Sequence, residues 1–242
     1  MKWNAPATNL TIAAELVREI EERAAALEAQ AQRDLARSPL LDGQWKLLYS
    51  NAREIRNLAL GLPLGFALGE TFQPLDTATG RFENIGSVEQ AQGVARARTR
   101  VVGDLRPAPP GTFNAARIQS TRGERVDVDF RRITFELDEL FGRPASLRKV
   151  VLPRPDPNAP QQSVDVTYID AGMRVTRGGD GSLFILRRVL PGTEEEARAP
   201  ALLTAAEREL LFAERGRDVV TGKGSRQSEN AGSPELRQLL KL

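Results

Sequence analysis

The chain has 242 residues, 40% of them hydrophobic, and a formal net charge of +2 at neutral pH. This length suits one large β domain with appendages or two small domains, and the composition is that of a soluble protein able to bury a core. The charge is too small to indicate a nucleic-acid partner. No apolar run approaches the roughly 20 residues that a membrane-spanning helix needs, so we expect any membrane contact to be peripheral.

The chain contains no cysteine and no histidine. The missing cysteines exclude disulfides, thiolate metal sites and a cysteine nucleophile, and the missing histidines remove the commonest general base and metal ligand. Only carboxylates, tyrosine, lysine, serine and threonine remain for chemistry. We therefore expect a protein that is not an enzyme, with no catalytic residues, no metal site and no cofactor.

Residues 8–37 show the periodicity of a long amphipathic helix. Asn9 or Thr11 is placed to cap its start, and Ser38 before Pro39 ends it, because the residue before a proline avoids the α region. The acidic residues of this segment do not fit a transit peptide, so we expect a mature form or a cell that needs no import. The apolar stripe consists of Ile12, Leu16, Ile20, Leu27 and Leu35, with Ala24 and Ala31 between them.

A run with a period of two begins at Gly43, Gln44 and Trp45, and this start is typical of the first strand of a closed β-barrel. We expect the wide indole of Trp45 to close one end of the barrel. Glycine, proline, aspartate and asparagine separate the later runs. The expected strands are Gln44–Ser50, Glu70–Leu75, Gly80–Val88, Gly93–Val102, Thr112–Ser120, Arg125–Leu137 with a break, Ser163–Ile169, Met173–Arg177 and Ser182–Val189.

Two of these runs carry information about register. The glycines between Gly178 and Gly181 favour a tight turn, so the strands on either side are expected to pair as a hairpin. Along Arg125–Arg131 apolar and charged residues alternate, but the apolar residues from Ile133 onward have the opposite parity. A bulge or bend at Arg131 and Arg132 would reconcile the two halves.

Two irregular regions interrupt the strands. The segment Pro153–Gln162 is rich in proline and polar residues and predicts an exposed loop. The segment Asn57–Glu70 is apolar and contains glycines and a proline. It would form either an inward-folded plug or a lipid-facing portal loop at the mouth of the barrel. The residues expected to face lipid or the portal are Leu60, Leu62, Leu64, Phe66 and Leu68.

After Pro191 the pattern becomes helical again. Thr204 and Glu207 have the spacing of a capping box. Residues 221–233 predict a flexible linker, and the apolar face of a short helix from Ser233 to Leu242 is expected to dock onto a partner. The sequence therefore divides into an N-terminal helix over 8–37, a barrel over 41–190 and a C-terminal helical extension over 191–242.

The run Gly93–Val102 has two contrasting faces. Small inward side chains would leave volume for a ligand, unless Phe72, Phe82 and Phe130 fill that space. The outward arginines would meet either anionic lipid headgroups or neighbouring carboxylates on a solvated face. The inward residues are Ala95, Ala97, Thr99 and Val101, and the outward residues are Arg96, Arg98 and Arg100.

Two separated motifs together resemble the plastid lipid-associated protein family, also called the plastid fibrillins. The first is SPLLDGQWKLLYS from Ser38 to Ser50, and the second is YIDAGMRVTRGGDGSLFILRR from Tyr168 to Arg188. The resemblance covers roughly Glu15–Val189, and the segment after Pro191 departs from it. The matching positions of the second motif are Asp170, Met173, Arg174, Val175, Arg177, Gly178, Gly181, Leu183, Phe184, Ile185 and Leu186.

This resemblance implies a mainly β, lipocalin-like antiparallel barrel at the thylakoid surface or on lipid globules. It also implies a ligand such as a prenyl quinone, a carotenoid or an acyl lipid, and a role in photoprotection. The compartment would be the cytoplasm and thylakoid surface of a cyanobacterium, or the plastid stroma, thylakoid or plastoglobule of an alga. One alternative is a scaffold whose terminal helices dock a photosynthetic membrane protein. A third is a bilin lyase-like protein that handles a chromophore.

Arginines near the end of the barrel are the residues of chemical interest. If Met173 and Val175 face inward, Arg174 points away, and Asp170 is placed to pair with Arg174 or Arg177. Such a pair would either lock the final hairpin or anchor a polar ligand head. In barrels of the implied type a late-strand arginine packs on the tryptophan of the first strand. We expect Arg187 or Arg188 to contact Trp45, and the ligand to enter at the opposite end, beside Leu58–Leu68.

Overall fold

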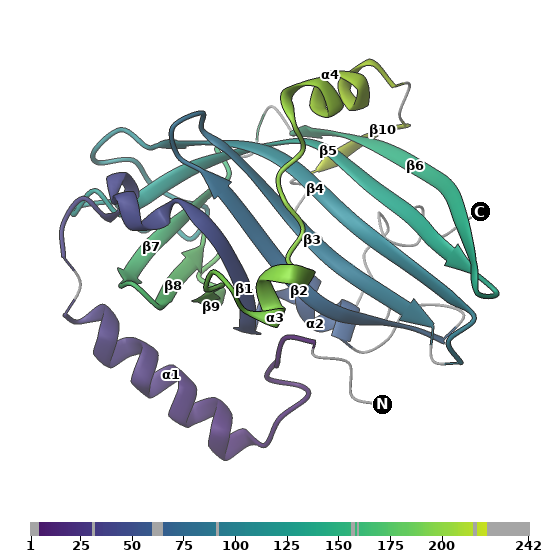
Figure 1. Cartoon of the computed structure of the whole chain (residues 1–242). Coiled ribbons are helices and arrows are strands. Elements are labelled where there is room, and N and C mark those ends of the chain that lie inside the picture. Colours follow the sequence, from purple (N-terminus) through teal and green to yellow (C-terminus); the bar gives the residue numbers. More distant parts are fainter. Residues whose placement is uncertain are drawn as a thin grey trace.

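The computed structural model describes residues 5–30, 32–59, 65–90, 92–155, 158, 160–214 and 217–221 (Figure 1). One antiparallel sheet forms most of the molecule. The strands are β1 Gly43–Ser50, β2 Phe66–Asp76, β3 Arg81–Gln90, β4 Ala95–Pro107, β5 Arg125–Leu140, β6 Arg143–Pro155, β7 Ser163–Ile169, β8 Met173–Gly178, β9 Leu183–Arg188 and β10 Arg217–Thr221. The α-helices are α1 Ala14–Glu28, α2 Arg53–Ala59, α3 Glu194–Arg198 and α4 Ala205–Ala213, and the 3₁₀ helices are η1 Leu35–Arg37 and η2 Pro39–Leu41.

The sheet closes on itself through the first part of β5. The strand order is β10-β6-β5-β4-β3-β2-β1-β9-β8-β7, and β5 also pairs with β7. Arg125, Val126 and Asp127 of β5 make this closing contact with β7. The result is a ring of eight strands, β1 to β5 and β7 to β9, which confirms the expected mainly β barrel with an N-terminal helix and short C-terminal helices.

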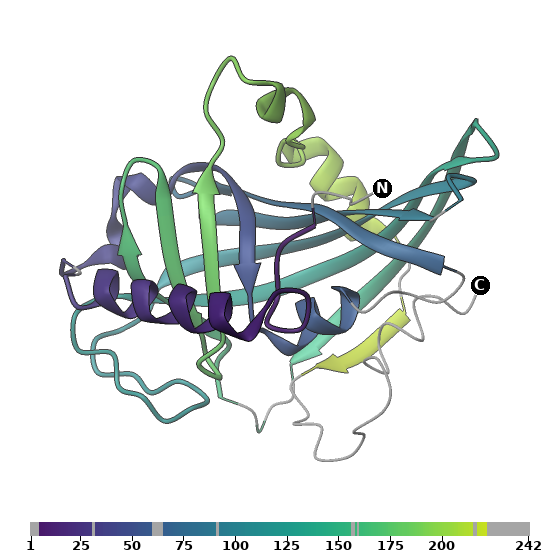
Figure 2. The same cartoon turned by 90° about the horizontal axis from the view of Figure 1, so that it is seen from below.

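The second part of β5 leaves the ring and pairs with β6 instead. Strands β2 to β6 therefore continue past the ring as a projecting sheet, which we call the flange (Figure 2). The predicted bulge allows β5 to serve both parts, because Val102 pairs with Arg132 while the adjacent Gly103 pairs with Phe130, which leaves Arg131 as the extra residue. The apolar residues before and after the bulge thus point to the same side of the sheet.

The core lies on the inner face of the ring and extends onto the flange. Trp45, Leu75, Phe82 and Val128 belong to the ring cluster. The flange has a second inner-face cluster, in which Phe66, Ile133 and Leu137 pack against buried residues of β3 to β6. One apolar surface therefore runs from the closed end of the ring to the free end of the sheet.

Helix α1 covers the outside of β7, β8 and β9 (Figure 2). Its buried Ala24 and the neighbouring Ile20 and Leu27 pack in a cluster with Val175 and Leu183. This contact explains the amphipathic pattern, because the apolar stripe of α1 needs an apolar strand surface to cover it.

The predicted helix over 8–37 is too long. The α-helix spans only Ala14–Glu28, and Asp34 has a left-handed φ of 60° where the chain redirects into η1. Leu35 therefore packs in the ring core instead of extending the helical stripe. Neither proposed residue caps α1, because the N-cap is Ala13 and makes no side-chain hydrogen bond. The Thr11 hydroxyl instead accepts a hydrogen bond from the Thr8 amide at 2.8 Å.

Other boundaries also differ from the predictions. Thr112–Ser120 lies in a loop with a single bridge between Phe113 and Gln119, and so it is not a strand of the sheet. Strand β6 was not predicted, and it extends to Pro155, inside the segment expected to be a loop. Proline is tolerated there because the pairing of β6 with β5 ends at Val151, so Pro153 and Pro155 have a paired strand, β10, on one side alone. Of the expected linker over 221–233 only Thr221, the last residue of β10, is described, and the helix from Ser233 lies outside the described residues.

Residues 190–214 cross the outer face of the sheet, and we call this segment the strap (Figure 1). Helix α4 begins with the predicted capping box between Thr204 and Glu207. Its Leu211 packs with Val102 and Val150 on the outer face of β4 and β6. The strap thus has its own small core and covers part of the outer surface of the sheet.

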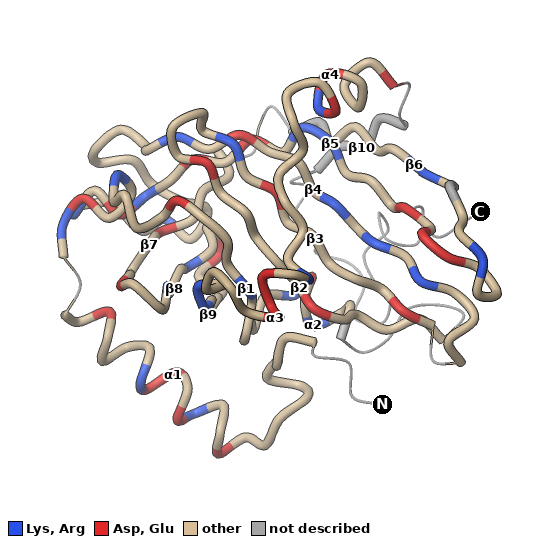
Figure 3. Tube along the Cα trace, viewed as in Figure 1, with Lys and Arg blue, Asp and Glu red and all other residues tan. Residues whose placement is uncertain are grey.

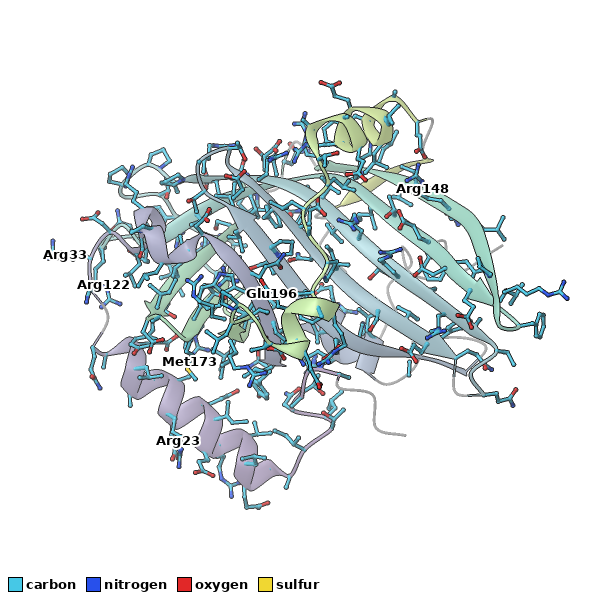
Figure 4. All side chains as sticks on the ribbon, in the orientation of Figure 1. Arg23, Arg33, Arg122, Arg148, Met173 and Glu196 are labelled. Carbon is cyan, nitrogen blue, oxygen red and sulfur yellow. The ribbon has the colours of Figure 1, made fainter. Side chains whose placement is uncertain are left out.

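Polar contacts hold the strap along its whole length. Near its start, Lys46 lies 3.0 Å from Glu195 and 2.6 Å from Glu70, and Arg198 Nε lies 3.1 Å from Glu70. At its end, Arg148 of β6 pairs with Glu214 directly after α4 (Figure 4). These pairs anchor the two ends of the strap on different strands.

The turn between β2 and β3 makes part of the stability depend on pH. The side chain and the backbone amide of Thr79, together with Arg81, lower the pKa of Asp76 to about 2. A depressed carboxyl pKa stabilises the fold above the unfolded value near 4, and this contribution is lost as the pH falls toward 2.

We predict that Asp76→Asn destabilises the protein at pH 7 by about 1 kcal/mol, because the turn loses a charged acceptor. The difference from the wild type should shrink as the pH falls from 4 to 2. Urea denaturation midpoints at pH 7, 4, 3 and 2 measure this difference. Glu194→Gln is the control, since Glu194 is exposed and its partner Arg198 is 3.9 Å away. A difference between Asp76→Asn and the wild type that stays constant with pH would contradict the assignment.

Candidate functional site

Trp45, the residue expected to close one end of the barrel, lies in the ring core near the start of β1. The Trp45 indole is fully buried in the ring cluster, and its Nε1 donates to the Leu41 carbonyl at 3.0 Å. The chain before β1 is thereby tied under the indole. Gly43 has a φ of 114°, and a Cβ there would lie 2.8 Å from Nη1 of Arg188, so the backbone passes close beside that side chain.

Arg188 of β9 is the late-strand arginine that packs on Trp45, with its guanidinium carbon 4.3 Å from the ring centroid. Its Nε donates to the Ala171 carbonyl at 2.9 Å, and Nη1 donates to the Asp42 carbonyl at 2.8 Å. Nη2 donates to the carbonyl of Leu40. Arg187 points elsewhere and pairs with Glu195 of the strap at 2.7 Å. Arg188 therefore ties two backbone segments, residues 40–42 and the β7–β8 turn at Ala171, to this end of the ring.

Arg174 of β8 also lies over Trp45, with its guanidinium carbon 4.8 Å from the ring centroid. The expectation that Arg174 points away from the interior is wrong. Its partner on β9 is Leu186, a core residue, whereas Val175 lies on the opposite face under α1. Because α1 covers the outside of β8, both faces of this strand are buried, and alternation in the sequence does not reveal which face is inside.

Arg174 is a buried cation for which the described part of the chain supplies no counter-ion. It is 3% exposed, and no carboxylate of the described residues pairs with it. Burial, and secondarily repulsion from Arg188, lowers the pKa of Arg174 to about 9. One nitrogen, Nη2, donates to the side-chain oxygen of Gln73, whereas the buried Nε has no hydrogen-bond partner. A buried charge of this kind costs free energy that the fold itself does not recover.

Further polar groups follow Arg174 along the inner face. Gln73 Nε2 donates to the side-chain oxygen of Asn84 at 2.6 Å, joining β2 to β3. Two residues before Gln73, the buried hydroxyl of Thr71 has no hydrogen-bond partner. We call Arg174, Gln73, Asn84 and Thr71 the inner polar row. It offers two unpartnered polar atoms to a molecule inside the ring, the Nε of Arg174 and the hydroxyl of Thr71.

The expected inward residues of β4 face the interior, but they differ in burial. Ala95 and Ala97 are buried, and Ala97 packs in the flange cluster. Thr99 and Val101, deeper in the ring, remain half-buried. Part of the surface of these two inward-facing side chains is therefore accessible to solvent.

Of the three phenylalanines expected to fill the interior, Phe82 and Phe130 pack in the ring core with Trp45. The Phe82 ring lies against Gly103, where an added Cβ would meet it at 2.4 Å, and it packs edge-on to Phe130 with 5.9 Å between ring centroids. Phe72, the third residue expected to fill the interior, faces outward instead. Its ring lies 5.8 Å from Lys46 Nζ, and Lys46 pairs with the strap.

Asp170 and Arg177 are not part of the interior. Asp170 accepts hydrogen bonds from the amides of Gly172 and Met173 and from the Tyr168 hydroxyl, at 2.7, 2.6 and 2.8 Å. Burial raises its pKa, but these donors lower it below the ordinary value. Arg177 pairs with Glu28 of α1 at 2.8 Å. Asp170 thus shapes the β7–β8 turn, Arg177 fastens α1, and the expected pairing between Asp170 and an arginine is wrong.

The outward arginines of β4 face carboxylates of the neighbouring strands (Figure 3). Arg96 pairs with Glu139, and Arg98 lies 2.5 Å from Asp138. Arg100 is buried, pairs with Glu83 and donates to the Ala201 carbonyl of the strap at 3.3 Å. This row therefore resembles the solvated, paired face more than a surface for anionic headgroups, and the strap covers its last member.

A cavity of about 460 Å³ lies on the outer face of the sheet, beside the strap. Phe72 and Ile85 line its apolar part, and charged residues of both signs surround it. Because Arg198 pairs with Glu70 there, and the β4 arginines pair with carboxylates of β5, each arginine that lines the cavity already has a carboxylate partner. Its lining does not include the inner polar row.

The expected portal residues fall into two groups. Leu60, Leu62 and Leu64 lie outside the described residues. Phe66 and Leu68 belong to β2, where Leu68 is buried and Phe66 packs in the flange cluster. The preceding helix α2 places Ile55 against the ring core, at the end away from the closed end.

Gln73, Asn84 and Thr71 were not identified from the sequence. In a strand with one exposed face, polar residues at alternate positions usually face water, so nothing in β2 or β3 marked them as interior. Among the described residues no group of three or more acidic side chains is arranged to hold a metal ion. The helices in the described part of the chain are too short or too polar to cross a membrane.

Comparisons with known proteins agree with the motifs in the sequence. The family model PAP_fibrillin matches residues 8–187. Plastid-lipid-associated protein 6, chloroplastic, from Arabidopsis thaliana is 32% identical over 158 residues, or 59% of this chain. That alignment covers 51% of the Arabidopsis protein, so the chain spans about half the length of this relative. No solved structure matches the chain.

We predict that removing the two arginines over Trp45 has different effects on stability. Arg188→Met should destabilise the protein by roughly 3 kcal/mol, because three backbone carbonyls lose a charged donor. Arg174→Met should change the free energy of unfolding by at most about 1 kcal/mol or stabilise the protein, because it removes a buried charge and keeps the volume. Urea denaturation at pH 7 compares the variants. A large loss in Arg174→Met would show that this cation has a structural role.

Proposed function

This chain belongs to the PAP_fibrillin family, and we propose that it is a non-catalytic protein that binds an amphiphilic lipid inside the eight-stranded ring. The observation that carries this proposal is Arg174, a cation buried on the inner face with no carboxylate partner among the described residues. A fold that keeps such a charge loses stability, as expected for a group whose partner arrives from outside the chain.

The position of Arg174 determines how a ligand would lie. Trp45 and Arg188 block the end beyond it, so the polar head would rest on the inner polar row and the apolar chain would extend toward the flange. Thr99 and Val101 would lie beside the first part of that chain, and Ile133 and Leu137 beside the rest. Apolar walls with a few polar groups at one end are typical of sites for single lipid molecules.

The head group is expected to carry an accepting oxygen. An arginine donates hydrogen bonds and accepts none, so a carboxylate or a quinone carbonyl suits Arg174, whereas a donor-only head does not. Of the ligands implied by the sequence motifs, an acyl lipid with a free carboxylate and a prenyl quinone therefore fit better than a hydrocarbon carotenoid.

The printed name of the Arabidopsis relative refers to lipids of plastids. In line with that name, we place this chain at the thylakoid surface or on lipid globules of a photosynthetic cell, in peripheral contact with lipid. Shielding a quinone or an acyl chain from oxidation there would support photoprotection.

We predict that the purified chain binds the fluorescent fatty acid cis-parinarate with a stoichiometry of one. Arg174→Met should weaken this binding about tenfold or more, because a charge-assisted hydrogen bond to the carboxylate is lost. Fluorescence titration at pH 7 measures the affinities. Arg177→Met is the matched control, since Arg177 lies outside the ring and pairs with α1.

Two further measurements complete the test. Native mass spectrometry of the chain from a photosynthetic host should show a bound molecule with a lipid-like mass, and organic extraction should recover it. Preparations with no lipid or pigment above background would contradict the proposal, as would equal parinarate binding by the wild type and Arg174→Met.

A further inference from the structure

The hairpin between β5 and β6 forms the outer tip of the flange, and we call residues 140–147 the tip. It lies at the end of the molecule farthest from β7 to β9 (Figure 1). Phe141 is 74% exposed, Leu147 is 60% exposed and Leu140 is 38% exposed. Three large apolar side chains thus gather at a projecting end of the sheet and leave most of their surface in water.

The turn at the tip is unfavourable for phenylalanine. Leu140 pairs with Arg143, so Phe141 and Gly142 form a two-residue turn, and both have positive φ values, 51° and 72°. Such turns favour asparagine followed by glycine, because a bulky residue is strained in the left-handed region. Phe141 neither packs in the core nor relaxes the turn, so the fold gives no reason for an aromatic residue at this position.

The charges around the tip are uneven. The carboxylates of β5 behind it, Asp138 and Glu139, pair with Arg98 and Arg96. Arg143 is exposed and pairs with no carboxylate of the described residues. The tip therefore presents apolar side chains together with an unpaired cation.

The apolar surface of the tip continues into the molecule. Leu147 pairs with Leu137 across β5 and β6, and Leu140 pairs with the inward-facing Ala95 of β4. Directly opposed residues of antiparallel strands point to the same face, so Leu140 and Leu147 extend the flange cluster of Phe66, Ile133 and Leu137. This surface leads from the tip toward the open end of the ring.

We propose that the tip inserts into a lipid bilayer with anionic headgroups, and that the inner face of the flange guides a lipid between the bilayer and the ring. Phe141, Leu140 and Leu147 enter the boundary between headgroups and acyl chains, and Arg143 pairs with an anionic headgroup. The guiding step rests on the proposed function, whereas the docking step does not.

A bilayer fits these observations better than a protein groove. Insertion needs only apolar side chains at a projecting end and a cation beside them, and this is the composition of the tip. The left-handed turn also holds the Phe141 ring at the outermost point of the hairpin.

The test is flotation of the full chain with vesicles of phosphatidylcholine containing about 30% phosphatidylglycerol, because the proposal requires an anionic surface. Phe141→Asn should lower the bound fraction about tenfold, from the transfer free energy of a phenylalanine side chain. Its free energy of unfolding should stay equal to that of the wild type or rise, because asparagine suits the turn. A structural role for Phe141 would instead lower stability.

Matched variants separate docking through the tip from non-specific binding by exposed apolar side chains. Phe113→Asn removes another exposed aromatic, 61% exposed, in the loop between β4 and β5, and should leave flotation unchanged. Arg143→Gln should weaken binding to the anionic vesicles but not to vesicles of phosphatidylcholine alone. Arg174→Met should float like the wild type, so that loss of the interior ligand and loss of docking are distinguishable.

Several outcomes would overturn the docking proposal. The docking proposal fails if the wild-type chain does not float with the vesicles, or if Phe141→Asn and Phe113→Asn lose flotation equally. Neither result would contradict the proposed function, which cis-parinarate binding tests. A change from dimer to monomer in sedimentation of Phe141→Asn, with flotation unchanged, would assign the tip to contact between copies. The guiding step fails if Phe141→Asn takes up cis-parinarate from vesicles as fast as the wild type does.

Discussion

The contact of Trp45 with two guanidinium groups is the constraint on which the rest of the structure depends. Arg188 ties residues 40–42 and the turn at Ala171 to β9 beside the indole. Arg174 lies over the same indole but brings a charge into the interior that no described side chain neutralises. Arg188 therefore stabilises the end of the ring near Trp45, and Arg174 makes that end suited to a ligand with an accepting oxygen. The same indole thus fills one end of the ring core and forms the base of the candidate site.

The long β5 strand links the ring to the flange. Its first residues close the barrel against β7, and after the bulge at Arg131 its later residues build the flange with β6. The bulge keeps the apolar residues of both halves on one face, so the inner surface is continuous from Trp45 to the tip of the hairpin. The candidate ligand site and the candidate membrane contact are therefore two ends of one apolar surface.

Much of this architecture was predictable, because local pattern determines it. Period-two alternation located most strands of the ring, and the change of parity after Arg131 located the bulge. The predictions failed where contacts distant in sequence decide the outcome. Arg174 was assigned to the wrong face because α1 buries the outside of β8. The polar residues Gln73 and Asn84 were not identified, because their partners come from other strands. Strand β6, which borders β10 at one edge, carries too little alternation to be recognised alone.

The buried pair of Glu83 and Arg100 bears on where the folding unit ends. Glu83 also accepts a hydrogen bond from the Leu203 amide at 2.9 Å, and Arg100 donates to the Ala201 carbonyl. The backbone of the strap therefore supplies one hydrogen-bond partner to each of the two buried charges. The match to the family model stops at residue 187, before the strap begins. A chain trimmed to that boundary would leave two charges on β3 and β4 with half of their partners. The family match therefore ends before the strap, whereas the part of the chain that packs together includes the strap.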